Sequence, residues 1–205
     1  MKSKANLLTQ LEKLPYFTKD TFLQIGQKYD LTQATLDTYI SRFLKFKDVI
    51  KLKNGFYVTK TFFEKNRLHN SYIFYLANIL REQSYISTWS ALQYYDLVTE
   101  VIHTITSVST KITRTYKNKA GNFVYNSINK ELSSDFLLVK GEFPFFIAKP
   151  SKALFDLLYF KTNQFNGVKI IEIPNLIKEL RIDFGEIKKG ERENFKKLIH
   201  KQYNI

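Results

Sequence analysis

The sequence predicts an α+β protein in which an N-terminal winged helix-turn-helix is followed by a mixed α+β C-terminal domain. Three observations support this: two closely spaced helix starts with matching caps, an Asn-Gly hairpin behind the second helix, and Val-, Ile- and Thr-rich segments farther along the chain. We expect domains at residues 1–60 and 61–205. The boundary is set by pattern alone, because no Pro-, Gly- or Ser-rich linker separates the halves.

The first domain is expected to hold three helices. Leucines recur at helical spacing from residue 7 to residue 14, and Pro15 ends that helix. Thr18 and Thr32 can each cap a following helix, because a threonine hydroxyl accepts a hydrogen bond from a free amide of the first turn. Two apolar pairs flank these caps and predict hydrophobic staples: Phe17 with Phe22, and Leu31 with Leu36. Two stapled helices with almost no loop between them indicate a helix-turn-helix.

The helix after Thr32 has two contrasting faces. An apolar stripe on one side is expected to be buried: Leu36, Ile40, Phe43 and Leu44. The opposite side combines short polar side chains with cations, a combination that suits close approach to base edges and neutralisation of phosphate in a DNA major groove. The residues that we expect to contact bases are Thr32, Gln33, Thr35, Thr38 and Arg42.

The pair Asn54-Gly55 lies between two alternating segments and predicts a β-hairpin with a type I′ turn. Lys51 and Lys53 would share one face of its first strand, and Ile50 and Leu52 the other. A basic hairpin directly behind the third helix is typical of a wing. Contacts to the DNA backbone are therefore expected from Lys45, Lys47, Lys51 and Lys53.

The second domain is expected to mix helices and strands. Apolar periodicity predicts one long helix over residues 62–83, then a short helix capped by Ser87. Strands are expected within 98–115 and at 123–128, 136–139 and 144–147. A helix should begin at Pro150 and end near Lys161, with two more helices at 175–181 and 191–202. Four cations form either a second nucleic-acid surface or a solvated hairpin: Lys111, Arg114, Lys117 and Lys119.

The charge of the chain points to a polyanionic partner. Lys and Arg number 32 against 19 Asp and Glu, which gives a net charge of +13, and the excess is densest in the first 60 residues.

The absence of cysteine excludes disulfides, thiolate metal sites and a thiol nucleophile. No signal peptide or 18-residue apolar run occurs, so we expect a cytoplasmic protein without membrane contact.

No catalytic or metal site is expected. The three histidines, His69, His103 and His200, lack metal-binding spacing, and no phosphate-binding glycine loop or nucleophile elbow occurs, so no cofactor is predicted. Asp156 could act as a general base, but the sequence shows no second acid or metal ligand beside it. A solvated residue or a structural hydrogen-bond partner is therefore the better interpretation of Asp156.

Two segments resemble the AbiEi antitoxin family of bacterial abortive-infection, type IV toxin-antitoxin systems. They are the run from Tyr85-Ile86-Ser87 through Ser90-Ala91-Leu92, and the helix from Ala148 to Tyr159. In that family, similar elements follow an N-terminal winged helix. Ser151 departs from the pattern, because many relatives carry an acidic residue there.

The resemblance implies a repressor that binds inverted repeats of double-stranded DNA in the promoter of its own operon. It also implies an antitoxin that counteracts a nucleotidyltransferase toxin without requiring a stable complex. The chain lacks the Gly-Ser pair expected of such a toxin, which favours the antitoxin partner. The alternatives are a winged-helix module for protein-protein interaction, a stand-alone regulator without a toxin, and an enzyme acting on nucleic acid or nucleotides.

Overall fold

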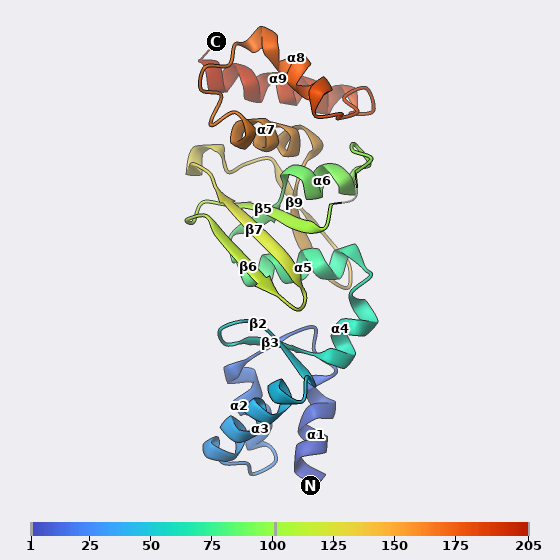
Figure 1. Ribbon diagram of the computed structural model, residues 1–205, viewed down its shortest axis with the longest axis vertical. Coiled ribbons are helices and arrows are strands. Elements are labelled where there is room, and N and C mark those ends of the chain that lie inside the picture. The colour runs from blue at the N-terminus through green and yellow to red at the C-terminus, as the bar shows by residue number, and fades with distance from the viewer. Residues whose placement is uncertain (1, 101, 205) are drawn as a thin grey trace. The chain divides into compact units, whose positions relative to one another are not determined.

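The computed structural model describes residues 2–100 and 102–204, with Lys2 and Ser3 described by their backbone only. The described chain forms two compact units (Figure 1). The first unit runs to Leu76 and includes Tyr116–Asn122; the second comprises Ala77–Thr115 and the chain from Phe123 onward. Helices and strands are mixed, which confirms the predicted α+β class. The boundary expected at residue 60 lies inside the first unit.

Short helices and a small sheet make up the first unit. The helices are α1 (Lys2–Leu11), α2 (Lys19–Gln27), α3 (Gln33–Lys45) and α4 (Lys60–Asn66). An antiparallel sheet in the order β1-β3-β2 contains β1 (Phe17–Thr18), β2 (Val49–Lys53) and β3 (Phe56–Thr59). The three expected helices and the hairpin are confirmed. Strand β1 was not expected, because two residues carry no period of their own.

Local capping fixes the starts of α2 and α3. The Thr18 hydroxyl accepts from the amide of Thr21 at 3.1 Å, and the Thr32 hydroxyl accepts from the amide of Thr35 at 3.3 Å. Both predicted caps are therefore confirmed. The rings of the first staple, Phe17 and Phe22, stack with their centroids 6.1 Å apart.

A single apolar core holds α1, α2, α3 and the sheet together. Its buried members are Leu7, Leu11, Phe17, Phe22, Leu36, Phe43 and Val49. Leu36 and Phe43 thus occupy the buried face predicted for α3, while Ile40 and Leu44 pack against the core half-buried. Gly26 of α2 is also buried, and a Cβ there would lie 3.0 Å from Cγ of Leu36 and closer to both of its methyl groups. The two helices approach each other closely because position 26 has no side chain.

The prediction of one long helix over residues 62–83 is wrong. Helix α4 ends at Asn66, and α5 begins at Asn70 and ends at Leu80. The Asn66 side-chain amide donates to the carbonyl of Phe62 at 2.9 Å, and such local bonds compete with the helical ladder. Leu68 lies in the break between the two helices and is 86% exposed.

The second unit is built on a six-stranded sheet in the order β6-β7-β5-β4-β9-β8. Strand β4 pairs antiparallel with β5 and parallel with β9, and β9 pairs antiparallel with the edge strand β8. The strands are β4 (Ser84–Ile86), β5 (Thr104–Ser109), β6 (Arg114–Asn118), β7 (Gly121–Ser127), β8 (Phe136–Val139) and β9 (Phe145–Ala148).

Strands β7, β8 and β9 agree with the predicted ranges to within two residues at each end. The expected strand region 98–115 is broken, because only β5 and the start of β6 are extended there, and Val101 lies outside the described residues. Strand β4 was not expected. The tip of the β6–β7 hairpin belongs to the first unit.

Four helices complete the second unit. They are α6 (Thr88–Tyr94), α7 (Pro150–Lys161), α8 (Ile173–Glu179) and α9 (Lys189–Tyr203). Pro150 lies in the first turn of α7, as predicted, and α8 and α9 confirm the two terminal helices. Figure 1 shows α7 between the sheet and the pair α8 and α9. Helix α7 is therefore covered on all sides, and every residue from Ser151 to Tyr159 is buried.

Candidate nucleic-acid interface

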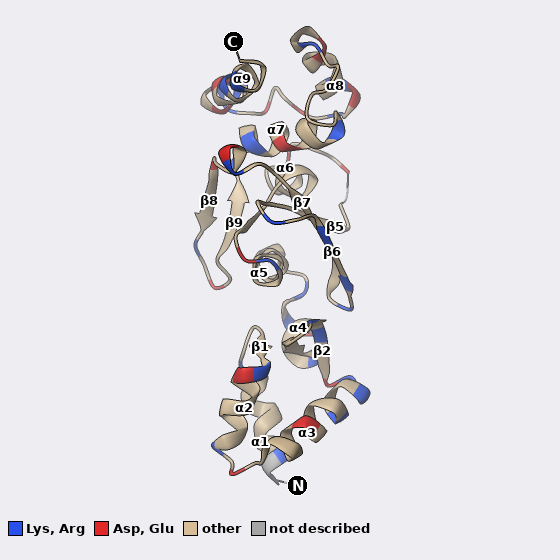
Figure 2. Cartoon of the chain, turned by 90° about the vertical axis from the view of Figure 1, so that its left-hand side faces the viewer, with Lys and Arg blue, Asp and Glu red and all other residues tan. Residues whose placement is uncertain are grey.

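The face of α3 opposite the core is open to solvent. Gln33, Thr38, Arg42 and Lys45 are exposed, and so is the capping residue Thr32, whereas Thr35 is half-buried. Arg42 and Lys45 lie in the last turn, so the positive charge is concentrated at the C-terminal end of the helix (Figure 2). Of the predicted base-contacting residues, Thr38 and Arg42 lie along one exposed side of α3 together with Lys45, whereas Thr32 and Gln33 lie at its N-terminal end.

The hydroxyl groups on this face are partly engaged by the helix itself. Those of Thr32 and Thr35 bond to each other at 2.9 Å as part of the cap. Thr38 donates to the carbonyl of Ala34 at 2.9 Å, and Ser41 donates to the carbonyl of Asp37 at 2.8 Å. In this arrangement the hydroxyls of Thr38 and Ser41 present lone pairs to solvent, so they can accept hydrogen bonds from a ligand.

Asp37 is a functional candidate that the sequence analysis missed. Its carboxylate accepts from the Gln33 amide, with both oxygens 3.2 Å from Nε2, and lies 3.4 Å from the Lys19 ammonium. The hydrogen bond from Gln33 and the charge of Lys19 lower the pKa of Asp37, so the group is anionic at neutral pH. The spacing of Gln33 and Asp37, four residues apart on a helix, was the signal that could have revealed the pair.

A shallow hollow of about 420 Å³ lies beside this acid on α3. Its lining residues are Asp37, Thr38, Ser41, Arg42 and Lys45. The hollow therefore offers both hydrogen-bond acceptors and cationic donors along one helical surface.

Helix α3 ends in a Schellman arrangement. The amide of Lys47 donates to the carbonyl of Leu44 at 3.2 Å, and the amide of Asp48 donates to the carbonyl of Phe43 at 2.9 Å. Lys47 has a φ of 63°, the left-handed conformation that glycine usually supplies at this position. The exposed Lys47 side chain is therefore held at the C-terminal end of α3 by a strained backbone.

The β2–β3 hairpin differs from the expected one in its turn. Of the two turn residues only Gly55 has a positive φ, of 78°, so the type I′ prediction is wrong. Lys51 pairs with Tyr57 and Lys53 with Phe56, which leaves Leu52 as an extra residue in a β-bulge. The bulge takes up the backbone rotation that a second left-handed residue would otherwise supply.

The two lysines of the hairpin have different environments. Lys51 is exposed, whereas Lys53 is half-buried with its ammonium 3.8 Å from the centre of the Phe56 ring. On the other face, Ile50 and Leu52 are buried as predicted. The carbonyl of Leu52 accepts from the side chain of Asn118, so the hairpin is supported on that side within the first unit.

The second basic surface stays a prediction. All four cations are exposed, but Lys111 and Arg114 belong to the second unit, while Lys117 and Lys119 belong to the first. We describe them separately for this reason.

The polar residues of the two family-like segments meet inside the second unit. Lys152 Nζ lies 2.5 Å from Asp156 Oδ1, and both side chains have no exposed area. Ser87 donates to Asp156 Oδ2 at 2.7 Å, and Tyr85 donates to the same oxygen at 3.2 Å. Ser87 stands at the start of α6, but its hydroxyl binds Asp156 rather than the helix amides that we expected it to cap. We call these four residues the buried polar cluster.

Asp156 is a structural hydrogen-bond partner, and the alternative of a solvated residue is wrong. Burial raises the pKa of its carboxyl, while Lys152, Ser87 and Tyr85 favour the carboxylate. Burial and the neighbouring carboxylate also raise the pKa of Tyr85. The cluster is closed to solvent, so it fits a role in holding α7 against β4 and α6.

Ser151, the position that departs from the family pattern, is buried at the start of α7. Its hydroxyl donates to Glu191 at 2.5 Å and accepts from the Asn194 amide at 2.9 Å. These bonds join the start of α7 to α9.

The described residues, 2–100 and 102–204, contain no group of three His, Asp or Glu side chains that could hold a metal ion. Within the same ranges, no helix has the length and apolar character needed to cross a membrane. No protein-family model matches the chain, and no curated protein matches its sequence significantly. The resemblance to the AbiEi antitoxins therefore stays a prediction.

Proposed function

We propose that the first unit is a winged helix-turn-helix and that the chain is a sequence-specific, DNA-binding transcriptional repressor of its own operon. One observation carries this proposal: the exposed face of α3 combines short polar side chains with Arg42 and Lys45, and a hairpin bearing the exposed Lys51 follows the helix in the same unit. Inverted repeats of double-stranded DNA are the proposed ligand.

In this proposal α3 lies in the major groove. The Arg42 guanidinium has the fork of donors that pairs with O6 and N7 of guanine, and the Gln33 amide can pair with adenine once it leaves Asp37. Helix α3 therefore carries candidate side chains for two bases.

The cations around α3 would contact phosphate. Lys45 and Lys47 extend from its C-terminal end, and Lys51 and Lys53 extend from the hairpin. If about six phosphates are neutralised per protomer, the logarithm of the association constant should fall with the logarithm of salt concentration with a slope of about −5.

A footprint on the chain's own promoter, followed by titration of three variants, tests the proposal. Arg42→Ala should lose discrimination between the operator and a scrambled duplex, because it removes a base contact. Lys51→Ala should weaken both duplexes equally, and Lys65→Ala, an exposed cation on α4, should weaken neither. Binding that ignores sequence, and that Arg42→Ala leaves unchanged, would overturn the assignment of α3.

The antitoxin role is a separate part of the proposal and rests on the family resemblance alone. The second unit would counteract a nucleotidyltransferase toxin without forming a stable complex. Co-expression of the chain with the toxin encoded next to it should restore growth, and residues 77–205 should be required for that effect. If growth is restored without residues 77–205 but is lost with Arg42→Ala, a role for the second unit is contradicted.

A further inference from the structure

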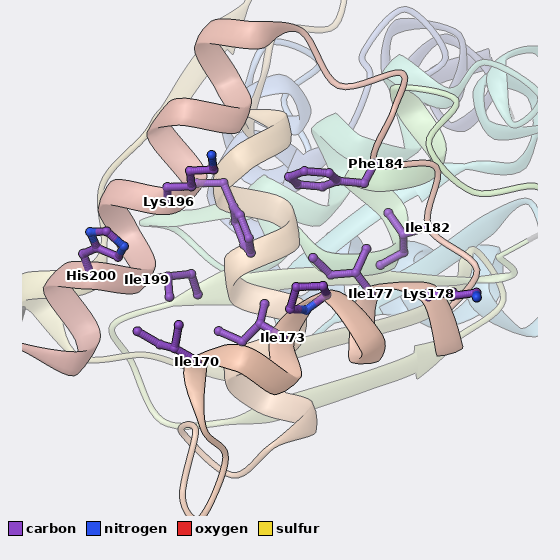
Figure 3. Close-up of a pocket in the computed structure, with 11 residues that line it drawn as sticks. Ile170, Ile173, Ile177, Lys178, Ile182, Phe184, Lys196, Ile199 and His200 are labelled. Carbon is purple, nitrogen blue, oxygen red and sulfur yellow. The ribbon is translucent and has the colours of Figure 1, made fainter.

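The terminal helices of the second unit enclose an apolar groove of about 620 Å³. Its floor comes from Ile173 and Ile177 of α8, Ile199 of α9 and Ile182 of the connecting segment. Figure 3 shows these isoleucine side chains pointing toward one another across the groove. The volume lies within the range of about 300–1,000 Å³ that is usual for small-molecule sites.

Aromatic packing shapes one end of the groove. The rings of Phe184 and Phe195 meet edge to face with their centroids 5.8 Å apart. Phe195 is buried and Phe184 is half-buried. The remaining walls are aliphatic, so the groove favours a flexible hydrocarbon chain.

Three basic side chains stand at the edge of the groove: Lys178 on α8, and Lys196 and His200 on α9. All three are exposed, and Figure 3 shows them at its periphery, with the ammonium groups of both lysines turned away from the isoleucines. No acidic residue is among the described side chains that line the groove. Neither lysine forms an ion pair within residues 2–100 and 102–204. The edge therefore carries positive charge on α8 and on α9 and complements an anionic head group on an apolar molecule.

We propose that this groove binds an aliphatic carboxylate, with the alkyl chain among the isoleucines and the carboxylate at the edge beside Lys196. Removal of methylene groups from water supplies the affinity, and the cationic edge sets the orientation. This site is distinct from the proposed DNA-binding face, and its occupancy does not depend on DNA.

A protein partner fits the groove less well. A stable protein interface needs about 800 Å² on each partner, with an apolar centre. The exposed residues of α8 and α9 next to the groove include Glu179, Glu193, Lys197 and Lys201, so the apolar surface ends at the groove on these two helices, and Ile171 is the exposed apolar residue beside it. A small amphiphile matches both the volume and the confined apolar area.

Titration of the full chain with decanoate, below its micelle-forming concentration, tests the proposal. With ¹³C-labelled isoleucine δ1 methyl groups, saturable NMR shifts are expected at Ile173, Ile177, Ile182 and Ile199. Octanoate should bind about 15-fold more weakly, because each methylene transferred from water contributes about a factor of four. An equal affinity for the two chain lengths would overturn the placement of the chain in the groove.

The charge at the edge is tested by head group and by variant. Decyltrimethylammonium, with the same chain and a cationic head, should bind at least tenfold more weakly than decanoate. Lys196→Glu should weaken decanoate about three- to tenfold, whereas Lys197→Glu, an adjacent exposed lysine outside the groove, should change it less than twofold. Equal effects of the two variants, or equal binding of both head groups, would overturn the proposed orientation of the ligand. If decanoate causes no NMR shifts at the four isoleucines, the site itself is wrong.

Discussion

Replacing one member of the buried Lys152–Asp156 pair should destabilise the second unit more than replacing both. The two charged groups have no exposed area and lie 2.5 Å apart. Removing one partner of a buried ion pair leaves an uncompensated charge and costs about 3–5 kcal/mol, whereas an uncharged pair of similar volume is often neutral. The buried polar cluster therefore predicts strong coupling between the two positions.

The structure gives a different cost for each single variant. In Asp156→Asn, the Lys152 ammonium loses its counter-charge and keeps the Phe155 and Tyr85 rings, 5.0 and 6.0 Å from its nitrogen, so the loss should be about 3–5 kcal/mol. In Lys152→Met, the carboxyl keeps its donors Ser87 and Tyr85 and can take up a proton. We therefore expect a smaller loss for that variant, about 2–3 kcal/mol.

The double variant Lys152→Met/Asp156→Asn retains an oxygen acceptor for Ser87 and Tyr85 and has no buried charge. Its cost should be about 1–3 kcal/mol, mainly from one unsatisfied amide. The coupling free energy in the double-mutant cycle is then at least about 2 kcal/mol.

Urea unfolding followed by the fluorescence of Trp89 measures the cycle. Trp89 is the only tryptophan, and it lies on α6, which packs against α7 in the second unit. Additive effects, with a coupling below about 0.5 kcal/mol, would refute the reasoning, because two independent polar groups would then account for the data.

Three further outcomes follow from other sites. Gly26→Ala should destabilise the first unit by about 1 kcal/mol, because crowding of Leu36 exceeds the gain in helix propensity; a more stable variant would contradict the close approach of α2 and α3. Lys47→Gly should raise the free energy of unfolding by about 0.5–1 kcal/mol, because glycine adopts the left-handed conformation without strain. The same variant should weaken DNA binding, because it removes a cation. A lower free energy of unfolding would argue against backbone strain at this position. Asp37→Asn should tighten binding to every duplex about threefold in low salt, measured by fluorescence anisotropy, and unchanged affinity would place the carboxylate away from phosphate.

The sequence predicted the features that short-range interactions decide. A threonine hydroxyl reaches an amide three residues away, so Thr18 and Thr32 identified the starts of α2 and α3. Pro150 identified the start of α7 for a similar reason. The hairpin followed from Asn54-Gly55, but its turn type did not, because the bulge depends on pairing across both strands.

Features that depend on distant contacts were missed. Strand β4 has only three residues and is defined by its pairing with β5 and β9. The buried polar cluster joins Tyr85 to Asp156 across 71 residues of sequence. Lys152 and Asp156 have the spacing of an exposed helical ion pair, and only the layers on both sides of α7 show that they are buried.

The candidate DNA-binding face was predicted in outline and not in detail. Amphipathic periodicity placed Arg42 and Lys45 opposite the buried stripe, because the helical period fixes the position of each residue around the helix axis. The Asp37 contacts were missed, although Gln33 lies one turn away, since Lys19 belongs to another helix. The bonds made by the hydroxyls of Thr38 and Ser41 depend on rotamers that a residue pattern does not specify.

The burial of the cluster changes how loss-of-function variants should be interpreted. Ser87 and Asp156 belong to the two segments that resemble the antitoxin family, yet both are closed to solvent and hold α7 against its neighbours. Loss of activity on replacing either residue would therefore be expected from unfolding alone and would not identify a catalytic group. Arg42 is exposed on α3, so Arg42→Ala should abolish sequence discrimination while the unfolding curve of the whole chain, followed by far-ultraviolet circular dichroism, stays unchanged. A change in function without a change in stability is thus the evidence that distinguishes a binding surface from the framework that supports it.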